Sequence, residues 1–185
     1  MADEIKFIGD VYPVQRIATG LWSLDRALGF KGDIGVPLRS LFELYGHEHS
    51  GKSTLAWYIA AKVNPNGTVF IADLEGTIEE KYVTAVMRNA GFSGTIRVAN
   101  YIEAKKGKDA LRPHEAQFQD AIDSLLEQDV SAEVIDSIGM FWPLVEAAKD
   151  LGERSMGQRA KTVADASRRV AAWLRVTENP KLCFY

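Results

Sequence analysis

Short apolar runs alternate with longer segments of helical periodicity along most of this chain. The apolar runs predict buried strands at residues 38–45, 69–72, 95–99, 133–136 and 181–184. Apolar residues spaced three and four positions apart predict helices at residues 21–28, 52–63, 79–89, 114–128 and 158–176. Strands that alternate with helices of this length require crossover connections, so we expect an α/β fold with a mainly parallel sheet and helices on both faces.

Two polar features and the C-terminus qualify this pattern. The residues 64–67, Asn-Pro-Asn-Gly, predict a turn between a helix and the next strand. Glu133 stands inside an otherwise apolar run, so we expect the strand at 133–136 to be short or to lie near an edge of the sheet. The chain stops at Tyr185 inside the last predicted strand, and we expect a core that is incomplete at the C-terminus.

The composition is that of a soluble globular protein with one main core. Of 185 residues, 46% are hydrophobic and 25% are charged, which excludes disordered, collagen-like and coiled-coil chains. The single cysteine, Cys183, cannot form an internal disulfide, and the sequence has neither a signal peptide nor an apolar run long enough to cross a membrane. We therefore expect a cytoplasmic protein without a membrane partner. The net charge of −3 argues weakly against a nucleic-acid partner.

One stretch matches the phosphate-binding pattern G-x-x-x-x-G-K-[ST] at every position. Its residues are Gly46, His47, Glu48, His49, Ser50, Gly51, Lys52 and Ser53. In this pattern the glycines let backbone N–H groups surround phosphates, the lysine reaches the β- and γ-phosphates, and the serine hydroxyl ligates Mg²⁺. The stretch follows a predicted strand and opens a predicted helix, whose N-terminus also favours an anion. A glycine turn that binds no phosphate is the alternative. The two histidines fit loop positions better than metal ligands, because neither a third histidine nor a cysteine lies near them in the sequence.

Carboxylates at two predicted strand ends complete this site. Asp136 ends the strand at 133–136, where it would hold Mg²⁺ through water, and its alternative role is to cap the next segment. Asp73 and Glu75 end the strand at 69–72, on the same rim of the sheet as the phosphate loop. Hydrolysis needs a base or water-positioning group near the γ-phosphate, and Glu75 is the better candidate because it lies further into the loop. A solvated strand end is the alternative for Glu75.

Several spaced motifs resemble the RecA/RadA recombinase family over residues 16–184. The resembling segments are Arg16-Ile17-Ala18-Thr19-Gly20, Ser23-Leu24-Asp25, Ala27-Leu28-Gly29, residues 43–54, Phe70-Ile71-Ala72-Asp73-Leu74-Glu75, Ile135-Asp136-Ser137, Pro143 and Met156-Gly157. By this resemblance the fold is a P-loop NTPase core of the RecA type, and the cofactors are ATP and Mg²⁺.

The resemblance also implies roles for individual side chains. Lys52 and Glu75 would be catalytic, with Glu75 activating the attacking water. Ser53 and Asp136 would hold the metal. Tyr82 would stack on the adenine. The further nucleotide-binding residues would be Thr54 and Glu79, together with the phosphate loop itself.

The implied function is that of an ATP-dependent recombinase core that binds single-stranded DNA, a DNA-dependent ATPase acting in homologous recombination and DNA repair. ATP would lie between adjacent protomers of a filament. Residues 1–15 would form a short extension with a candidate polymerisation strand, and residues 16–185 a partial core that lacks the second DNA-binding loop and the closing strands. The alternatives are a recombinase paralogue without strand exchange and a RecA-like ATPase of the helicase type, regulating DNA metabolism.

Charge is segregated along the chain in a way that the total conceals. Residues 154–175 carry a net charge of +5, which leaves −8 for the remaining residues. Arg154, Lys161, Arg168 and Arg175 recur every seven positions, so the last three form one stripe along a predicted helix. This stripe weakens the argument that the net charge makes against nucleic acid.

The stripe is a candidate DNA-binding face, because basic residues beside a loop are typical of binding to a phosphate backbone. Val163 and Val170 lie on the other side of the predicted helix and should face the core. With the resemblance, the candidate DNA-binding residues are Arg154, Met156, Gly157, Lys161 and Arg168. A solvated surface is the alternative for the stripe, and a packing role is the alternative for Met156.

Overall fold

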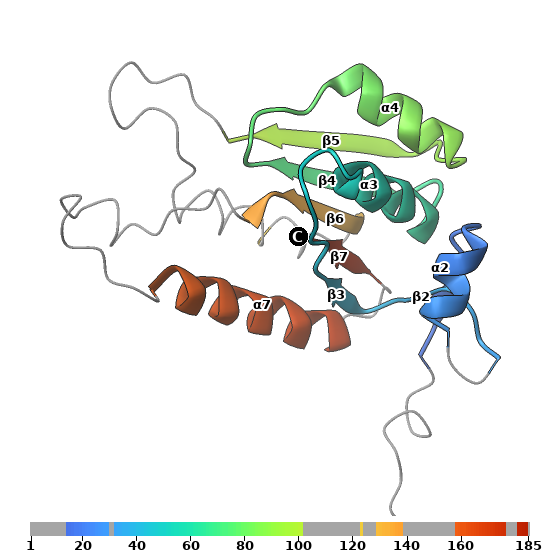
Figure 1. Ribbon diagram of the computed structural model, residues 1–185, viewed down its shortest axis with the longest axis horizontal. Helices are drawn as coiled ribbons and strands as arrows, with labels where there is room; N and C mark the ends of the chain where they lie inside the picture. The colour runs from blue at the N-terminus through green and yellow to red at the C-terminus, as the bar shows by residue number, and fades with distance from the viewer. Residues whose placement is uncertain are drawn as a thin grey trace, which may run out of the picture. The chain divides into compact units, whose positions relative to one another are not determined.

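The computed structural model describes residues 14–29, 32–101, 123, 129–138, 158–176 and 181–184. The chain forms two compact units, Met1–Leu38 and Arg39–Tyr185. The second unit contains a parallel sheet with helices, which confirms the predicted α/β class (Figure 1).

In the described residues of the first unit there are two short strands and one helix. β1 (Arg16–Ile17) pairs antiparallel with β2 (Val36–Pro37), and α2 (Trp22–Ala27) lies between them in the sequence. Gly35, just before β2, has a φ of +101°, and a Cβ atom there would lie 2.1 Å from the carbonyl oxygen of Ile17. Only glycine therefore fits where the two strands meet.

Asp25 organises the turn that leads into α2. Its carboxylate accepts hydrogen bonds from the N–H and the hydroxyl of Thr19, at 2.8 and 2.7 Å, and from the N–H of Gly20 at 3.0 Å. Burial by itself raises the pKa of Asp25, but these hydrogen bonds outweigh it, so that the pKa lies below its usual value. Arg16 contacts the segment at the other end of α2, since its Nη1 donates to the carbonyl oxygens of Leu28 at 2.6 Å and of Gly35 at 2.9 Å. The Thr-Gly and Asp of the N-terminal motif thus hydrogen-bond to one another before α2, while its Arg binds the backbone that follows α2.

Five parallel strands form the sheet of the second unit, in the order β3-β7-β6-β4-β5. Their bounds are Ser40–Phe42 for β3, Thr68–Asp73 for β4, Thr95–Asn100 for β5, Val130–Asp136 for β6 and Leu182–Phe184 for β7. Because neighbouring strands are parallel, their carboxyl ends meet at one edge of the sheet, which we call the carboxyl edge. Asp73 and Asp136 lie opposite each other in register at this edge.

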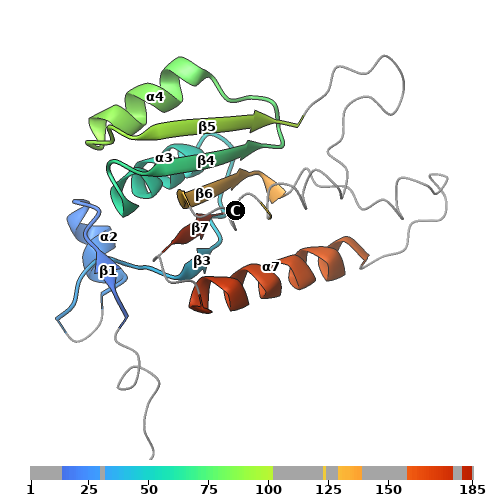
Figure 2. The same ribbon diagram turned by 180° about the vertical axis from the view of Figure 1, so that it is seen from behind.

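The helices α3 (Lys52–Val63), α4 (Glu80–Asn89) and α7 (Gln158–Val176) flank the sheet (Figures 1 and 2). α3 packs against β6 and β7 and also against α4. α7 covers the opposite face of the sheet, where it packs against alternate residues of the strands. This core cluster comprises Phe70, Ala72, Leu74, Val130, Ile135, Ala166, Val170, Leu174 and Cys183. None of the helices described here is both long and apolar enough to span a membrane.

Most predicted elements of the described residues are confirmed. α3 and α7 have the predicted bounds, and the turn at 64–67 forms with a hydrogen bond from the N–H of Gly67 to the carbonyl oxygen of Asn64 at 3.0 Å. Val163 and Val170 pack toward the core, as the helical spacing predicts. The predicted helix at 114–128 lies, apart from residue 123, outside the described residues.

The predicted buried strand at 38–45 is wrong in length and burial. β3 covers only three residues, Ser40–Phe42, and all three are half-buried. The reason is its place in the sheet, because among the described strands β3 pairs with β7 alone and lies at an edge.

The expectation that Glu133 marks a short or edge strand is also wrong. β6 has 7 residues and lies between β7 and β4. The Glu133 side chain is fully buried on the face that α7 covers, opposite Cys183 in register. Burial raises the pKa of the Cys183 thiol well above its usual range, and the nearby Glu133 carboxylate raises it further. The local hydrophobic pattern does not report which polar side chains the interior of a sheet can hold.

Candidate functional site

The phosphate-loop pattern forms the connection between β3 and α3 at the carboxyl edge. Lys52 begins α3 and turns its ammonium group back over the loop, where Nζ donates to the carbonyl oxygens of Gly46 at 3.1 Å and of His47 at 2.9 Å. Gly51 has a φ of +85°, a left-handed conformation that lets the chain pass directly into the helix. The carbonyl groups of the loop therefore hold the Lys52 ammonium group, the positive charge that a bound phosphate would need.

The remaining side chains of the loop are exposed. They are those of His47, Glu48, His49 and Ser50. Within the described part of the chain, no group of three or more His, Cys, Asp or Glu side chains is placed to hold a metal ion. Mg²⁺ next to nucleotides is usually bound by one or two protein oxygens together with oxygens of phosphate and water.

Asp136 ends β6 beside the first turn of α3. Its carboxylate is hydrogen-bonded to the hydroxyl of Ser53. Burial raises the pKa of Asp136, and the carboxylates of Glu75 and Asp73 raise it further, while the Ser53 hydroxyl and the Lys52 ammonium act in the opposite direction. The two oxygen ligands that the sequence predicts for Mg²⁺ thus contact each other, and a hydroxyl with a carboxylate is a donor set that suits this ion.

Glu75 lies just beyond β4 and is held by a residue from β6's end. The hydroxyl of Ser137 donates to Oε1 of Glu75 at 2.6 Å. The backbone N–H groups of Leu74 and Glu75 both bond to the carbonyl oxygen of Asp136, at 2.7 and 3.3 Å. The sequence pattern assigns no role to Ser137, although its position directly after Asp136 puts it at the same edge.

Asp73 is buried and shapes the loop that carries Glu75. Its carboxylate accepts hydrogen bonds from the N–H groups of Gly76 at 2.6 Å and of Thr77 and Ile78 at 3.3 Å. A carboxylate engaged in this way is a turn-forming group. This environment separates Asp73 from Glu75, the half-buried carboxylate that the sequence favours as the water-positioning group.

Tyr82 projects from α4 toward α3. Its Oη lies 3.0 Å from Oγ1 of Thr54, and its ring forms an edge-to-face contact with Trp57, with centroids 6.0 Å apart and ring planes at 76°. Glu79 immediately precedes α4, and its exposed carboxylate makes no capping hydrogen bond to that helix. The sequence pattern assigns no role to Trp57, although it is three residues from Thr54 and so lies on the same side of α3.

A small cavity of about 40 Å³ lies between α3 and the end of β6. Its lining includes Lys52, Ser53, Asp136 and Ser137. A larger cavity of about 650 Å³ lies between α4 and β5, and none of the phosphate-loop residues lines it. The smaller cavity holds little more than water, so a nucleotide would lie over the exposed loop.

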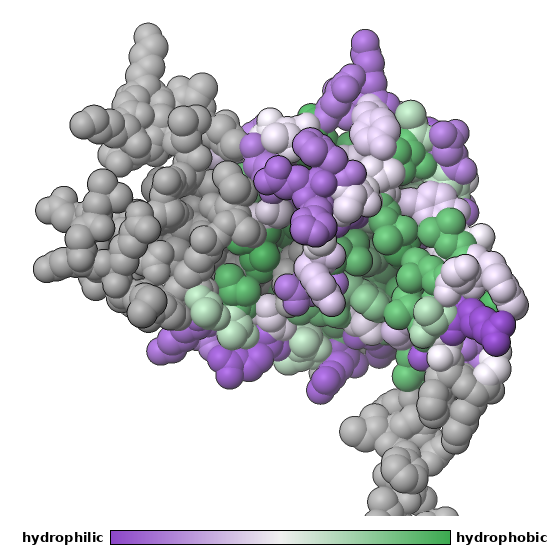
Figure 3. Space-filling view, in the orientation of Figure 1, coloured by the Kyte–Doolittle hydropathy of each residue, from purple (hydrophilic) through white to green (hydrophobic). Residues whose placement is uncertain are grey.

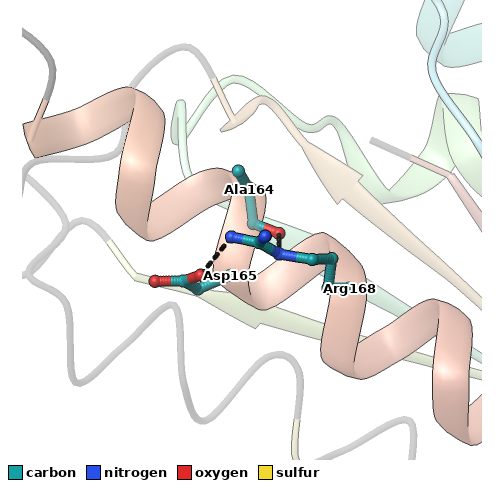
Figure 4. Close-up of polar contacts among 3 residues, drawn as sticks. All are labelled: Ala164, Asp165 and Arg168. Carbon is teal, nitrogen blue, oxygen red and sulfur yellow. Dashed lines mark hydrogen bonds and ion pairs between the residues drawn. The ribbon is translucent and has the colours of Figure 1, made fainter.

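The outer face of α7 carries exposed basic side chains, including those of Lys161 and Arg168, and Figure 3 shows hydrophilic residues along this side of the molecule. Arg168 is engaged within its own helix (Figure 4). Its Nε donates to the carbonyl oxygen of Ala164 at 3.2 Å, and its Nη2 forms an ion pair with Asp165. The stripe therefore exists on the helix, but an acidic neighbour partly offsets its charge. The other candidate DNA-binding residues, Arg154, Met156 and Gly157, lie outside the described residues.

The chain is similar in sequence to known proteins. The family model described as the RecA N-terminal domain matches residues 8–184. Protein RecA of Chlorobium chlorochromatii (strain CaD3) is 28% identical over 173 residues, which are 93% of this chain and 44% of that protein. Protein RecA of Clostridium botulinum (strain Eklund 17B / Type B) is 30% identical over 169 residues, 90% of this chain and 43% of that protein. Protein RecA of a Nitratiruptor species is 31% identical over 170 residues, which are 88% of this chain and 44% of that protein. The chain thus spans less than half the length of each of these relatives.

Proposed function

The chain belongs to the RecA family, and on that premise we propose that it is an ATP-dependent recombinase core that binds single-stranded DNA in homologous recombination and repair. One observation carries the proposal. Side chains from the phosphate loop, from the end of β4 and from the end of β6 contact one another at the carboxyl edge of the sheet. These contacts support the roles that we propose for Lys52 as the cation, Glu75 as the base and Asp136 as a metal ligand for a nucleoside triphosphate on the loop.

In this proposal Lys52 and the N-terminus of α3 bind the phosphates. The ammonium group that now bonds to the carbonyl oxygens of Gly46 and His47 would transfer these hydrogen bonds to phosphate oxygens, where they gain from the opposite charge. The backbone N–H groups at the start of α3 add the positive end of the helix dipole. Ser53 and the ionised form of Asp136 would hold Mg²⁺, which neutralises charge on the phosphate oxygens.

Glu75 would orient the attacking water and accept its proton. A carboxylate can do this only when it is ionised and held within hydrogen-bonding distance of the water. The hydrogen bond from Ser137 restricts the rotation of the Glu75 carboxyl group. The ATP-bound form would bind DNA, and hydrolysis would then release the DNA.

The DNA-binding part of the proposal rests on the outer face of α7 and the residues before it. Lys161 and Arg168 would contact the phosphate backbone, together with Arg154, Met156 and Gly157. Arg168 would exchange its intrahelical partner Asp165 for a phosphate. ATP would be shared between protomers of a filament, with residues 1–15 as the segment that joins neighbours.

The nucleotide half is tested by equilibrium binding of Mg²⁺·ATP to the 185-residue chain. Lys52→Ala should weaken binding and abolish any hydrolysis, whereas Lys62→Ala, at the far end of the same helix, should leave both unchanged. Equal behaviour of the two variants would overturn the nucleotide assignment.

The DNA half is tested by the fluorescence anisotropy of a labelled thymidine oligonucleotide at several salt concentrations. Lys161→Ala and Arg168→Ala should each reduce the affinity and the dependence on salt, because each removes one phosphate contact. Lys81→Ala on α4 removes an exposed charge elsewhere and should have no such effect.

The pairing of Arg168 with Asp165 favours a second candidate function, that of a nucleotide-binding family member that regulates DNA metabolism without gripping DNA itself. The same titration separates the two functions. Salt-independent or undetectable DNA binding, with Lys52-dependent binding of ATP intact, would favour the second.

A further inference from the structure

A cluster of three side chains joins α3 to α4 one helical turn from the phosphate-loop lysine. Thr54 lies two residues after Lys52 and its Oγ1 is 3.0 Å from the Oη of Tyr82. Trp57 lies one turn further along α3 and contacts the Tyr82 ring edge-to-face, with centroids 6.0 Å apart. The two aromatic residues differ in exposure, because Trp57 is 5% exposed and Tyr82 is 49% exposed.

These contacts fix Tyr82 at two points. Thr54 holds its hydroxyl, and the buried indole of Trp57 holds one side of its ring. An edge-to-face pair stabilises a defined relative orientation of the rings beyond the effect of burial alone. The exposed half of Tyr82 is therefore presented in one orientation beside the phosphate loop, as a flat apolar surface next to a site for anions.

We propose that Trp57 is a positioning residue for Tyr82, and that through this ring it makes the site select ligands that carry a planar base as well as phosphates. The inference rests on the proposed binding of nucleotides by the loop. A purine offers a π face that stacks on Tyr82, whereas inorganic triphosphate offers only oxygens to the loop and to Lys52. Trp57 therefore acts on the affinity for the base and not on the affinity for phosphate.

Two substitutions of Trp57 distinguish a positioning role from a simple contribution to stability, and the indole N–H determines their choice. Its Nε1 is buried and has no hydrogen-bond partner among the described residues, which costs free energy in the folded state. Trp57→Phe removes this donor but keeps an aromatic ring for Tyr82 to contact. Trp57→Leu removes the donor and the ring together.

The experiment measures the affinities of the 185-residue chain for ATP and for inorganic triphosphate, both with Mg²⁺. Trp57→Leu should weaken ATP binding by roughly 2- to 10-fold, the range expected for the loss of one aromatic pair, and leave triphosphate binding unchanged. Trp57→Phe should bind both ligands as the original chain does. Ile59→Ala, which truncates a buried residue two positions after Trp57 in the same helix, controls for a general loosening of α3.

Two results would overturn the inference. One is an equal loss of affinity for ATP and triphosphate in Trp57→Leu, which would mean that Trp57 only stabilises the fold. The other is unchanged ATP binding in Trp57→Leu. If the original chain bound neither ligand, or bound both regardless of Lys52, the proposed function itself would fail. Should Trp57→Leu not fold, Trp57→Met, which fills more of the buried volume without an aromatic ring, takes its place in the comparison with Trp57→Phe.

Discussion

The carboxyl edge of the sheet and the outer face of α7 both carry residues that a phosphate-binding protein needs, but the fold builds them differently. At the carboxyl edge, side chains from distant segments contact each other. The pairs are Ser53 with Asp136, Glu75 with Ser137, and Thr54 with Tyr82. On α7, Lys161 and Arg168 project from a single helix, and the contacts of Arg168 are with that helix (Figure 4).

This difference decides how much each arrangement says about function. Glu75 and Ser137 are separated by 62 positions, and holding two such side chains together costs conformational entropy that the whole fold must offset. An exposed pair three residues apart on one helix needs no tertiary structure and contributes little to stability. The functional assignment of the carboxyl edge therefore rests on contacts between side chains from distant segments of the chain. That of α7 rests on the charge of its exposed side chains alone.

The largest expected effect tests the carboxyl edge directly. Glu75→Gln removes the proposed base but keeps the size of the side chain, so ATP hydrolysis should fall by about 10²- to 10⁴-fold. Steady-state hydrolysis and equilibrium binding of ATP should be measured together, with binding nearly unchanged. Glu80→Gln, a few residues further along, is the matched control. Hydrolysis that survives in Glu75→Gln would remove this carboxylate from the chemistry.

A smaller effect on hydrolysis is expected for Ser137, which would act only by positioning Glu75. Ser137→Ala removes the hydrogen bond to Glu75, and the loss of a bond to a charged group corresponds to roughly a tenfold lower rate of hydrolysis. The turnover number should fall while the KM for ATP stays the same. Ser131→Ala, within β6, should have no effect. A change in KM alone would show that Ser137 acts on binding instead.

The pH dependence of stability tests the electrostatics of the edge in the metal-free chain. Because the pKa of Asp136 is raised in the folded state, its contribution to stability is fully present below the usual value of 3.8 and is lost as the pH rises through the raised value. The groups that face it are the carboxylates of Glu75 and Asp73, the Ser53 hydroxyl and the Lys52 ammonium.

The free energy of unfolding should therefore fall with rising pH in the original chain relative to Asp136→Asn, as measured by denaturant titration at each pH. A difference between the two chains that does not change with pH would contradict the raised pKa.

The smallest effect tests α7. Asp165→Asn frees Arg168 from its ion pair, and an exposed pair of this kind is worth enough to change affinity by about 2- to 5-fold. Binding of a labelled thymidine oligonucleotide at low salt should tighten by that factor. Asp129→Asn makes the same change of charge at an exposed site on another part of the chain. An equal response to both substitutions would mean that only net charge matters.

The sequence predicted the local parts of this architecture well. The bounds of α3 and α7 follow from helical periodicity, which depends on residues three and four positions apart. The position of the phosphate loop between a strand and a helix follows from its pattern in the same way. Asp136 and Glu75 could be placed at one edge, because parallel strands bring their carboxyl ends together.

The sequence could not predict features that depend on which strands become neighbours. The half-burial of β3 follows from its edge position, and Glu133 lies in a central strand that a local pattern marks as marginal. The different surroundings of Asp73 and Glu75 depend on three backbone N–H groups that donate to Asp73 alone. Trp57 was not predictable as a partner of Tyr82, because the two residues belong to helices whose packing no spacing within either helix reveals.

The rate at which the Cys183 thiol is alkylated can be used to measure local opening of the sheet. It is the single thiol of the chain, lies on a strand flanked by two others, and is 1% exposed. With its pKa raised by burial and by Glu133, it offers almost no thiolate to an alkylating reagent while the sheet is closed. The rate of alkylation then reports the free energy of opening around β7. A ligand that binds only the closed form at the neighbouring edge should slow this reaction in proportion to its occupancy.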